Sequence, residues 1–110
     1  MHAVVETKAY LRAAKDAGMT QEEQDDVVTL LANNPEAGDP IQGSGGCRKV
    51  RVRKPGTGKS GGYRLITFYT GVEYPVFLIT VFGKNERDNL TKAERNDLAK
   101  MAGMLTAALR

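Results

Sequence analysis

Tryptophan is absent from this chain of 110 residues, and cysteine and histidine occur once each. The one cysteine, Cys47, cannot form a disulfide within the chain. Together with His2 it cannot supply the ligands of a structural zinc site. We therefore expect neither a metal centre nor a cofactor, and we look for chemistry among the charged side chains.

Long hydrophobic runs are lacking as well. The longest nearly apolar stretch, Pro75 to Gly83, is far shorter than the roughly 18 residues that cross a bilayer. The N-terminus has no basic patch followed by an apolar stretch, so no secretory signal is read. We expect a cytoplasmic protein that makes no membrane contact. A chain of this length has room for one core, so we expect a single domain over residues 1–110.

Acidic residues are missing from one stretch of an otherwise mixed chain. Residues 1–45 hold three basic and eight acidic side chains, a balance of −5, whereas residues 46–64 hold seven basic and no acidic ones, a balance of +7. The seven are Arg48, Lys49, Arg51, Arg53, Lys54, Lys59 and Arg64. Such a concentrated positive field is typical of a surface that binds a polyanion, with nucleic acid as the leading candidate. The alternative is a solvated strand face without a partner.

The N-terminal part of the chain predicts a helical hairpin. Residues 8–17 have a helical pattern that Gly18 can end in a left-handed conformation. Thr20 and Glu23 have the spacing of a capping box, in which each residue binds the backbone amide of the other. This box starts a second helix with an apolar stripe, which ends before Pro35.

Four segments have the composition of β-strands. They are residues 3–6, 47–54, 63–69 and 75–83, the last of which is apolar on both faces and predicts a buried strand. Side chains alternate along the second segment, with Arg48, Val50 and Val52 on one face and Lys49, Arg51 and Arg53 on the other. The same alternation puts Arg64 on the side of Ile66 and Phe68. The glycine-rich residues 55–62 predict a turn between two antiparallel strands.

The C-terminal part predicts one more helix. Thr91 and Glu94 form another capping box, and apolar residues keep helical spacing to the end of the chain. One face of this helix is apolar and either packs on the sheet or binds a partner. The predicted fold class is therefore α+β, an antiparallel sheet of about four strands with an N-terminal helical hairpin and a C-terminal amphipathic helix.

Three blocks of sequence carry a resemblance to a known family. They read IQGSGGCRKVR at residues 41–51, GKSGGYRLI at 58–66 and FGKNE at 82–86. In this order, with a helical hairpin before them and an amphipathic helix after them, the sequence resembles the HigB branch of the RelE toxin superfamily. The resemblance extends over nearly the full length of the chain.

The resemblance implies a toxin of a type II toxin-antitoxin system. Such a protein has a compact RelE-like α+β fold and cleaves messenger RNA in the decoding site of the ribosome. Its implied partners are a cognate antitoxin and the ribosome with its message, and it reaches operator DNA only through the antitoxin. The implied activity is that of a metal-independent endoribonuclease.

Two cations are the candidate catalytic residues. Cleavage of RNA requires that the 2′-hydroxyl be deprotonated, the phosphorane stabilised and the 5′-oxygen protonated. Arg64 can direct two N–H groups to the phosphate oxygens. Lys84 follows the buried strand and either transfers a proton or holds a phosphate. The alternative for each is a structural role at the surface.

Other residues are candidates for binding the RNA. Lys49 and Arg51 are expected to position the message or contact ribosomal RNA, whereas Arg53, Lys54 and Lys59 supply nonspecific affinity. Tyr63 and Phe82 are aromatic residues that either stack on bases or belong to the core, and the core is favoured for Phe82. Asn85 is a further candidate, beside Lys84.

The sequence departs from the family at the residues that move protons. Many relatives have a tyrosine where Phe82 stands, and others use a C-terminal tyrosine or a histidine. This chain has no histidine after His2 and no tyrosine after Tyr74. Lys84, Glu86 and a relay through a 2′-hydroxyl or water remain as the general acid and base.

Three rival functions remain. A ParE-type toxin inhibits DNA gyrase and needs no RNA-cleaving site. A nucleic-acid-binding module without catalysis needs only the basic strands. A protein-interaction domain uses the acidic helices and the basic sheet for assembly, and its expression causes no growth arrest.

Overall fold

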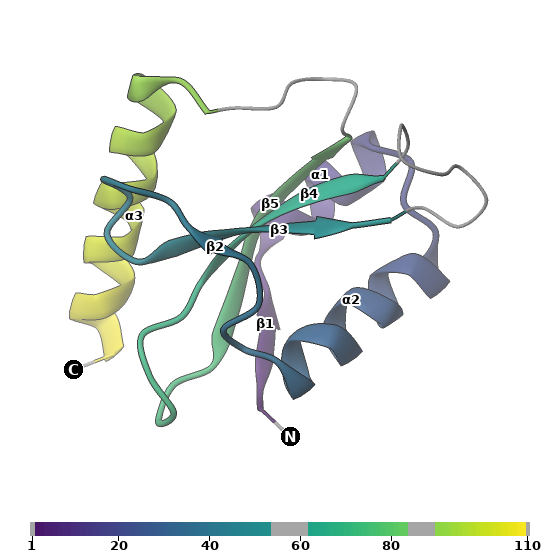
Figure 1. Ribbon diagram of the computed structural model, residues 1–110, viewed down its shortest axis with the longest axis horizontal. Helices are drawn as coiled ribbons and strands as arrows, with labels where there is room; N and C mark the ends of the chain where they lie inside the picture. The colour runs from purple at the N-terminus through teal and green to yellow at the C-terminus, as the bar shows by residue number, and fades with distance from the viewer. Residues whose placement is uncertain (1, 54–61, 84–89, 110) are drawn as a thin grey trace.

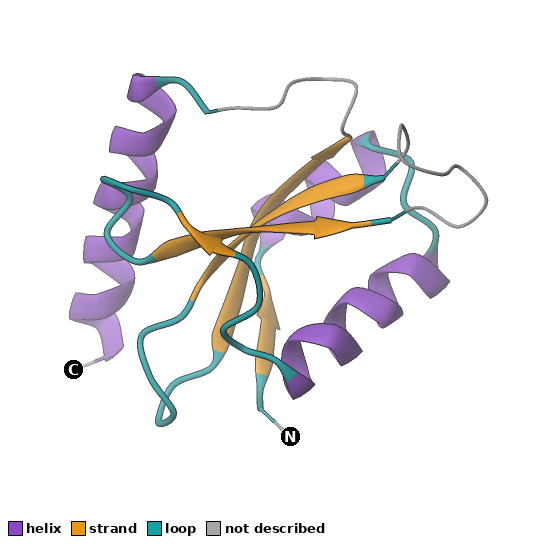
Figure 2. Ribbon diagram, in the orientation of Figure 1, coloured by secondary structure: helices purple, strands orange, loops and turns teal. Residues whose placement is uncertain are grey.

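The computed structural model describes residues 2–53, 62–83 and 90–109. Within them a twisted sheet lies between two helices on one face and one helix on the other (Figures 1 and 2). In chain order the elements are β1 (Val4–Glu6), α1 (Lys8–Asp16), α2 (Gln21–Asn33), β2 (Asp39–Pro40), β3 (Cys47–Val52), β4 (Tyr63–Phe68), β5 (Val76–Gly83) and α3 (Lys92–Leu109). The α+β architecture expected from the sequence is confirmed. None of the described helices is long and apolar enough to cross a membrane.

The helix boundaries follow the local signals in the sequence. The amide of Glu23 donates to the Thr20 hydroxyl at 3.1 Å, and the amide of Thr20 donates to the Glu23 carboxylate at 2.8 Å. Thr91 and Glu94 make the same reciprocal pair before α3. After α1, Gly18 has a φ of +77°, a conformation that costs glycine little. Both capping boxes and the glycine stop are therefore confirmed.

The sheet is mixed and has one strand more than the sequence predicted. Its order is β1-β5-β4-β3-β2, and β3, β4 and β5 are antiparallel as expected. β1 pairs with β5 in parallel, because the chain runs through the whole helical hairpin before it returns to the sheet. β2 is a two-residue strand at the edge of β3, and its Pro40 made it read as loop.

A β-bulge in β5 sets which side chains share a face. Ile66 pairs with Thr80, but Thr67 pairs with Leu78, so Ile79 is an extra residue in β5. The alternation of side chains in β5 therefore shifts by one residue at this point. As a consequence Phe82, opposite Arg64, lies on the face that α3 covers.

Two apolar clusters hold the layers together. The larger one joins α1 and α2 to one face of the sheet, with Tyr10, Leu31, Leu65 and Leu78 fully buried. The smaller one joins Leu98 and Ala102 of α3 to the other face, as listed by its buried sheet residues Cys47, Ile66, Phe68, Ile79 and Phe82. The apolar face of the last helix thus packs on the sheet, which was one of the two expectations for it.

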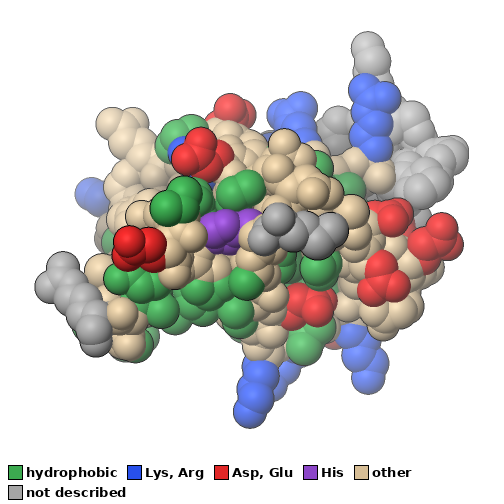
Figure 3. Space-filling view, turned by 90° about the horizontal axis from the view of Figure 1, so that it is seen from below, with side chains coloured by type: hydrophobic (Ala, Val, Ile, Leu, Met, Phe, Trp, Pro, Cys, Tyr) green, Lys and Arg blue, Asp and Glu red, His purple; other side chains and the backbone are tan. Residues whose placement is uncertain are grey.

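The N-terminus is fixed to the same end of the sheet as the turn between β4 and β5. The backbone amide of His2 donates to the Ala32 carbonyl at 2.7 Å, and its ring nitrogen Nε2 contacts the Tyr74 carbonyl. The His2 ring also meets the Tyr69 ring edge to face at 5.1 Å. Figure 3 shows the histidine on this face among hydrophobic side chains. His2 therefore joins α2 to the β4–β5 turn.

Candidate functional site

The basic residues of β3 and β4 meet in a row across the sheet. Arg51 lies directly opposite Arg64, and Arg64 lies directly opposite Phe82 of β5. One position along, Lys49 lies opposite Ile66. We call Lys49, Arg51 and Arg64 the basic row. Since Ile66 and Phe82 pack in the cluster of α3, the basic row is on the α3 face of the sheet.

Arg64 and Arg51 have different surroundings within this row. The Arg64 side chain is 3% exposed, whereas Arg51 is exposed. Burying a guanidinium costs solvation free energy, which its surroundings must offset. Side chains directly opposite in antiparallel strands have Cβ atoms about 5 Å apart, where like charges repel. An anion placed between Arg51 and Arg64 would be attracted to both.

Arg48 belongs to the opposite face, as its position in the alternation predicted. Its guanidinium Nη1 donates to the carbonyl oxygens of Glu36 at 3.2 Å and Gly38 at 3.3 Å. Arg48 therefore supports the connection from α2 to β2. Its role is structural, and it does not extend the basic row.

Tyr63 does not lie beside the basic row. It alternates with Arg64 along β4, belongs to the cluster of α1 and α2, and is 4% exposed. Its hydroxyl donates to the Glu23 carboxylate at 3.2 Å. Burial raises the pKa of Tyr63, and both the charge of Glu23 and this hydrogen bond act in the same direction. Its hydroxyl therefore stays protonated and anchors α2 to the sheet.

Phe82 takes the place across from Arg64. It is 5% exposed and packs with Ile66 and Leu98, which confirms the expectation that it is a core residue. Arg53 is exposed just beyond the end of β3. The remaining candidates, which are Lys54, Lys59, Lys84, Asn85 and Glu86, lie outside the described residues.

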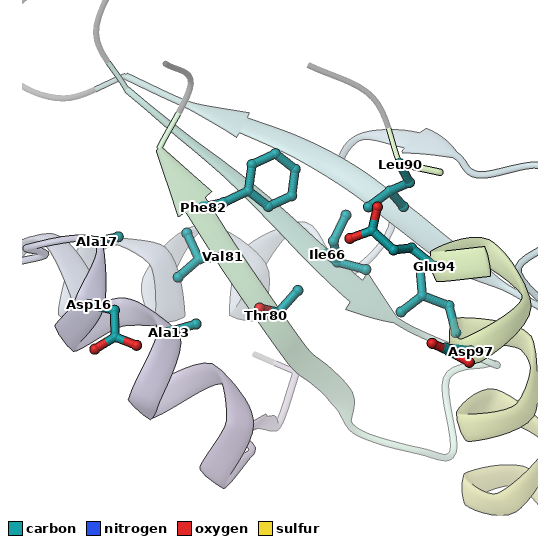
Figure 4. A pocket seen from close by; sticks show the side chains of 11 residues that line it. Ala13, Asp16, Ala17, Ile66, Thr80, Val81, Phe82, Leu90, Glu94 and Asp97 are labelled. Carbon is teal, nitrogen blue, oxygen red and sulfur yellow. The ribbon is translucent and has the colours of Figure 1, made fainter. Parts of the chain in front are cut away.

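A hollow of about 370 Å³ opens beside Phe82, between α1 and α3 (Figure 4). Its floor includes Ile66, Thr80 and Phe82 from the sheet. Its walls carry carboxylates that the sequence did not single out, namely Asp16 of α1 and Glu94 and Asp97 of α3. Glu94 also caps α3 through the amide of Thr91. Phosphate is repelled by carboxylates, so this hollow favours the apolar or cationic part of a ligand.

Cys47 is unsuited to act as a nucleophile. Its side chain is 1% exposed, and burial raises the pKa of the thiol, an effect that its hydrogen bond with Ser44 only partly offsets. The thiol therefore remains protonated, and the thiolate is the reactive form. In the part of the chain that the structure describes, no group of three His, Cys, Asp or Glu residues could hold a metal ion.

Comparison with known proteins places this geometry in a family. Residues 2–110 match the model of the family described as the RelE toxin of the RelE/RelB toxin-antitoxin system. Among solved structures, the chain resembles a double arginine-to-alanine mutant of the E. coli toxin RelE in the free state, with a TM-score of 0.51 and 19% sequence identity. The alignment covers 94% of this chain and 95% of the E. coli chain, and at this identity it supports the fold. Because the family model spans almost the entire sequence, this protein belongs to the RelE toxin family.

Proposed function

We propose that this protein is a ribosome-dependent endoribonuclease that cleaves messenger RNA in the cytoplasm, and that it belongs to the HigB branch of its family. The observation that carries the proposal is the basic row, in which a buried arginine lies directly opposite an exposed one. Two guanidinium groups on adjacent strands match a phosphodiester, whose oxygens accept hydrogen bonds from both.

The proposed reaction is attack by the 2′-hydroxyl on the adjacent phosphorus. The 2′-oxygen forms a bond to phosphorus while the bond from phosphorus to the 5′-oxygen breaks. A base takes the 2′-hydroxyl proton and an acid gives a proton to the 5′-oxygen, leaving a 2′,3′-cyclic phosphate and a 5′-hydroxyl. The negative charge that builds on the phosphorane is the quantity that a positioned guanidinium stabilises.

Each residue has a proposed role in this reaction. Arg64 stabilises the phosphorane, because its burial fixes the guanidinium in place. Arg51 and Lys49 hold the flanking phosphates. Lys84 moves a proton or holds the phosphate, and Asn85 assists in binding; both assignments rest on the FGKNE block.

The remaining RNA contacts are assigned by charge. We propose that Arg53 and Lys59 add nonspecific affinity for the backbone of the RNA. Tyr63 was a candidate for stacking on bases, but its burial against α2 favours a structural role.

The proposed partners follow from the family and from the substrate. The family is named for a system that pairs RelE with RelB, and we propose an antitoxin of that kind as the inhibitor. We propose the translating ribosome as the platform, and contact with operator DNA only through the antitoxin.

The experiment that tests the function is induced expression in bacteria without the antitoxin, followed by mapping of the 5′ ends of messages. The wild-type chain is expected to arrest growth and to create new 5′-hydroxyl ends within translated codons. Arg64→Ala is expected to abolish both, and Arg64→Lys, which keeps the charge but loses the two-pronged geometry, to retain a small part. Exposed Arg51→Ala should reduce cleavage without affecting folding.

Arg12→Ala is the matched control, since Arg12 is an exposed arginine on α1. Circular dichroism of each purified variant shows whether it folds. Growth arrest with intact messages and damaged DNA would instead identify a gyrase inhibitor. The absence of arrest, with RNA binding retained, would identify a binding module without catalysis.

A further inference from the structure

A second cationic cleft lies between α3 and the connection from β2 to β3. Gln42 and Gly43 of the connection form one wall, and Lys92, Arg95 and Asn96 of α3 form the other. The cleft encloses about 270 Å³. None of its residues belongs to the basic row or lines the hollow beside Phe82.

The connection is held against α3 by its own sequence (Figure 1). Gly45 has a φ of +78°, and a Cβ atom there would lie 3.3 Å from the Cβ of Ala102 and 3.5 Å from the Cα of Ala99. Glycine therefore permits both the conformation and the close approach. Ser44 is fully buried; its hydroxyl donates to the Ile41 carbonyl at 2.6 Å and accepts from the Cys47 amide at 3.1 Å. The wall of the cleft is thus a built turn.

The charges of α3 are sorted between its faces. Lys92, Arg95 and Asn96 are at positions i, i+3 and i+4, so they share one face of the helix. Glu94 and Asp97, also three residues apart, line the hollow on another face. The residues that line the cleft therefore include two cations, two amide side chains and no carboxylate. The cleft also lies at the first two turns of α3, where the helix dipole favours an anion.

We propose that this cleft binds a phosphodiester of RNA, as a second contact apart from the basic row. Lys92 and Arg95 neutralise the phosphate, and the amide groups of Gln42 and Asn96 can bind the adjoining sugar or base. A backbone with a charge at every nucleotide can occupy the basic row and the cleft together. The proposal rests on the proposed function for the identity of the ligand, and either the message or ribosomal RNA can supply the phosphodiester.

The test compares the affinity of the wild-type chain and of Lys92→Gln/Arg95→Gln for two probes. The first is a fluorescein-labelled 2′-O-methyl RNA oligonucleotide, which resists cleavage through the 2′-hydroxyl, and the second is empty 70S ribosomes. We expect the double variant to bind at least one of them about tenfold more weakly at low salt. The slope of log affinity against log salt should decrease by about 0.7 for each lost phosphate contact on a single strand.

Lys8→Gln/Arg12→Gln is the matched control, because it removes two exposed cations from α1. Its affinity for both probes should change less than about twofold. Loss of affinity for the oligonucleotide assigns the cleft to the message, and loss for the ribosome alone assigns it to ribosomal RNA. Unchanged affinity and salt slope for both probes overturn the proposal.

Two further outcomes separate this proposal from its neighbours. A variant that loses the antitoxin in co-purification but binds both probes normally would overturn it in favour of a protein partner. Cleavage by the wild-type chain is measured separately, on programmed ribosomes. Weakened binding by the double variant together with an inactive wild type would reject the proposed nuclease and keep the cleft.

Discussion

At the residue scale, the informative side chains are polar groups that the fold buries. Arg64 is buried in the basic row, and Tyr63 is buried with its hydroxyl on Glu23. Tyr10 of α1 is completely buried too, but its hydroxyl makes no hydrogen bond within the described structure. The two tyrosines therefore form a natural comparison, because one hydroxyl is satisfied and the other is not.

Tyr10→Phe is expected to raise the free energy of unfolding by about 1 kcal/mol. A buried hydroxyl without a partner has lost its hydrogen bonds to water and gained none, so its removal relieves that cost. Tyr63→Phe should lower the free energy of unfolding by a similar amount, because it leaves Glu23 without a donor. Urea titration of both variants measures the difference. A Tyr10→Phe protein less stable than the wild type would contradict this interpretation.

The same tyrosine predicts a loss of stability at high pH. Burial, followed by the charge of Glu6, raises the pKa of Tyr10 from 10.0 to about 12. Between these values the unfolded chain releases the proton while the folded chain keeps it. The stabilisation is complete below pH 10 and decreases as the pH rises toward 12. The decrease should be smaller in Tyr10→Phe, as measured by urea unfolding over this range. Equal decreases in the two proteins would exclude Tyr10 as the cause.

At the element scale, local signals were sufficient for the helices and for the three antiparallel strands. Capping boxes at Thr20 and Thr91 and the alternation in β3 depend on neighbouring residues, so the sequence reveals them. The parallel pairing of β1, the short β2 and the bulge at Ile79 depend on contacts between distant segments. The alternation along β4 could also have placed Tyr63 on the face opposite Arg64.

Two glycines with similar backbones make a test of how β2 is held. Gly38 has a φ of +90°, and a Cβ atom there would lie 2.3 Å from the carbonyl oxygen of Lys49 in β3. Gly18 has a φ of +77° and open space around the same position. Gly18→Ala should cost about 1 kcal/mol, from the left-handed conformation alone. Gly38→Ala should cost clearly more in thermal or urea unfolding, since β2 must also move away from β3. Equal losses would show that the close approach contributes nothing.

At the scale of the whole molecule, the two faces of the sheet are covered unequally. α1 and α2 together bury five residues, among them Tyr10 and Leu31, in the larger cluster. α3 is the longest helix described, yet only Leu98 and Ala102 are buried in it. The basic row and the cationic cleft both adjoin this lightly anchored helix. The side of the molecule that is proposed to meet RNA is thus the one with the smaller core.

Hydrogen exchange of the backbone amides tests this asymmetry. A segment opens at a cost set by the apolar contacts that it loses, so α3 should exchange through openings that leave the rest of the fold intact. The amides of β4 and β5 should exchange only with global unfolding, because β4 is buried along its whole length. We expect protection in α3 to be lower by at least about tenfold, measured by mass spectrometry or NMR. Leu98→Ala, which removes one of the two anchors, should widen the difference, whereas Met104→Ala, at a side chain that is 68% exposed, should not. Equal protection of α3 and β4 would mean that the molecule opens as one unit, with α3 bound as firmly as the strands.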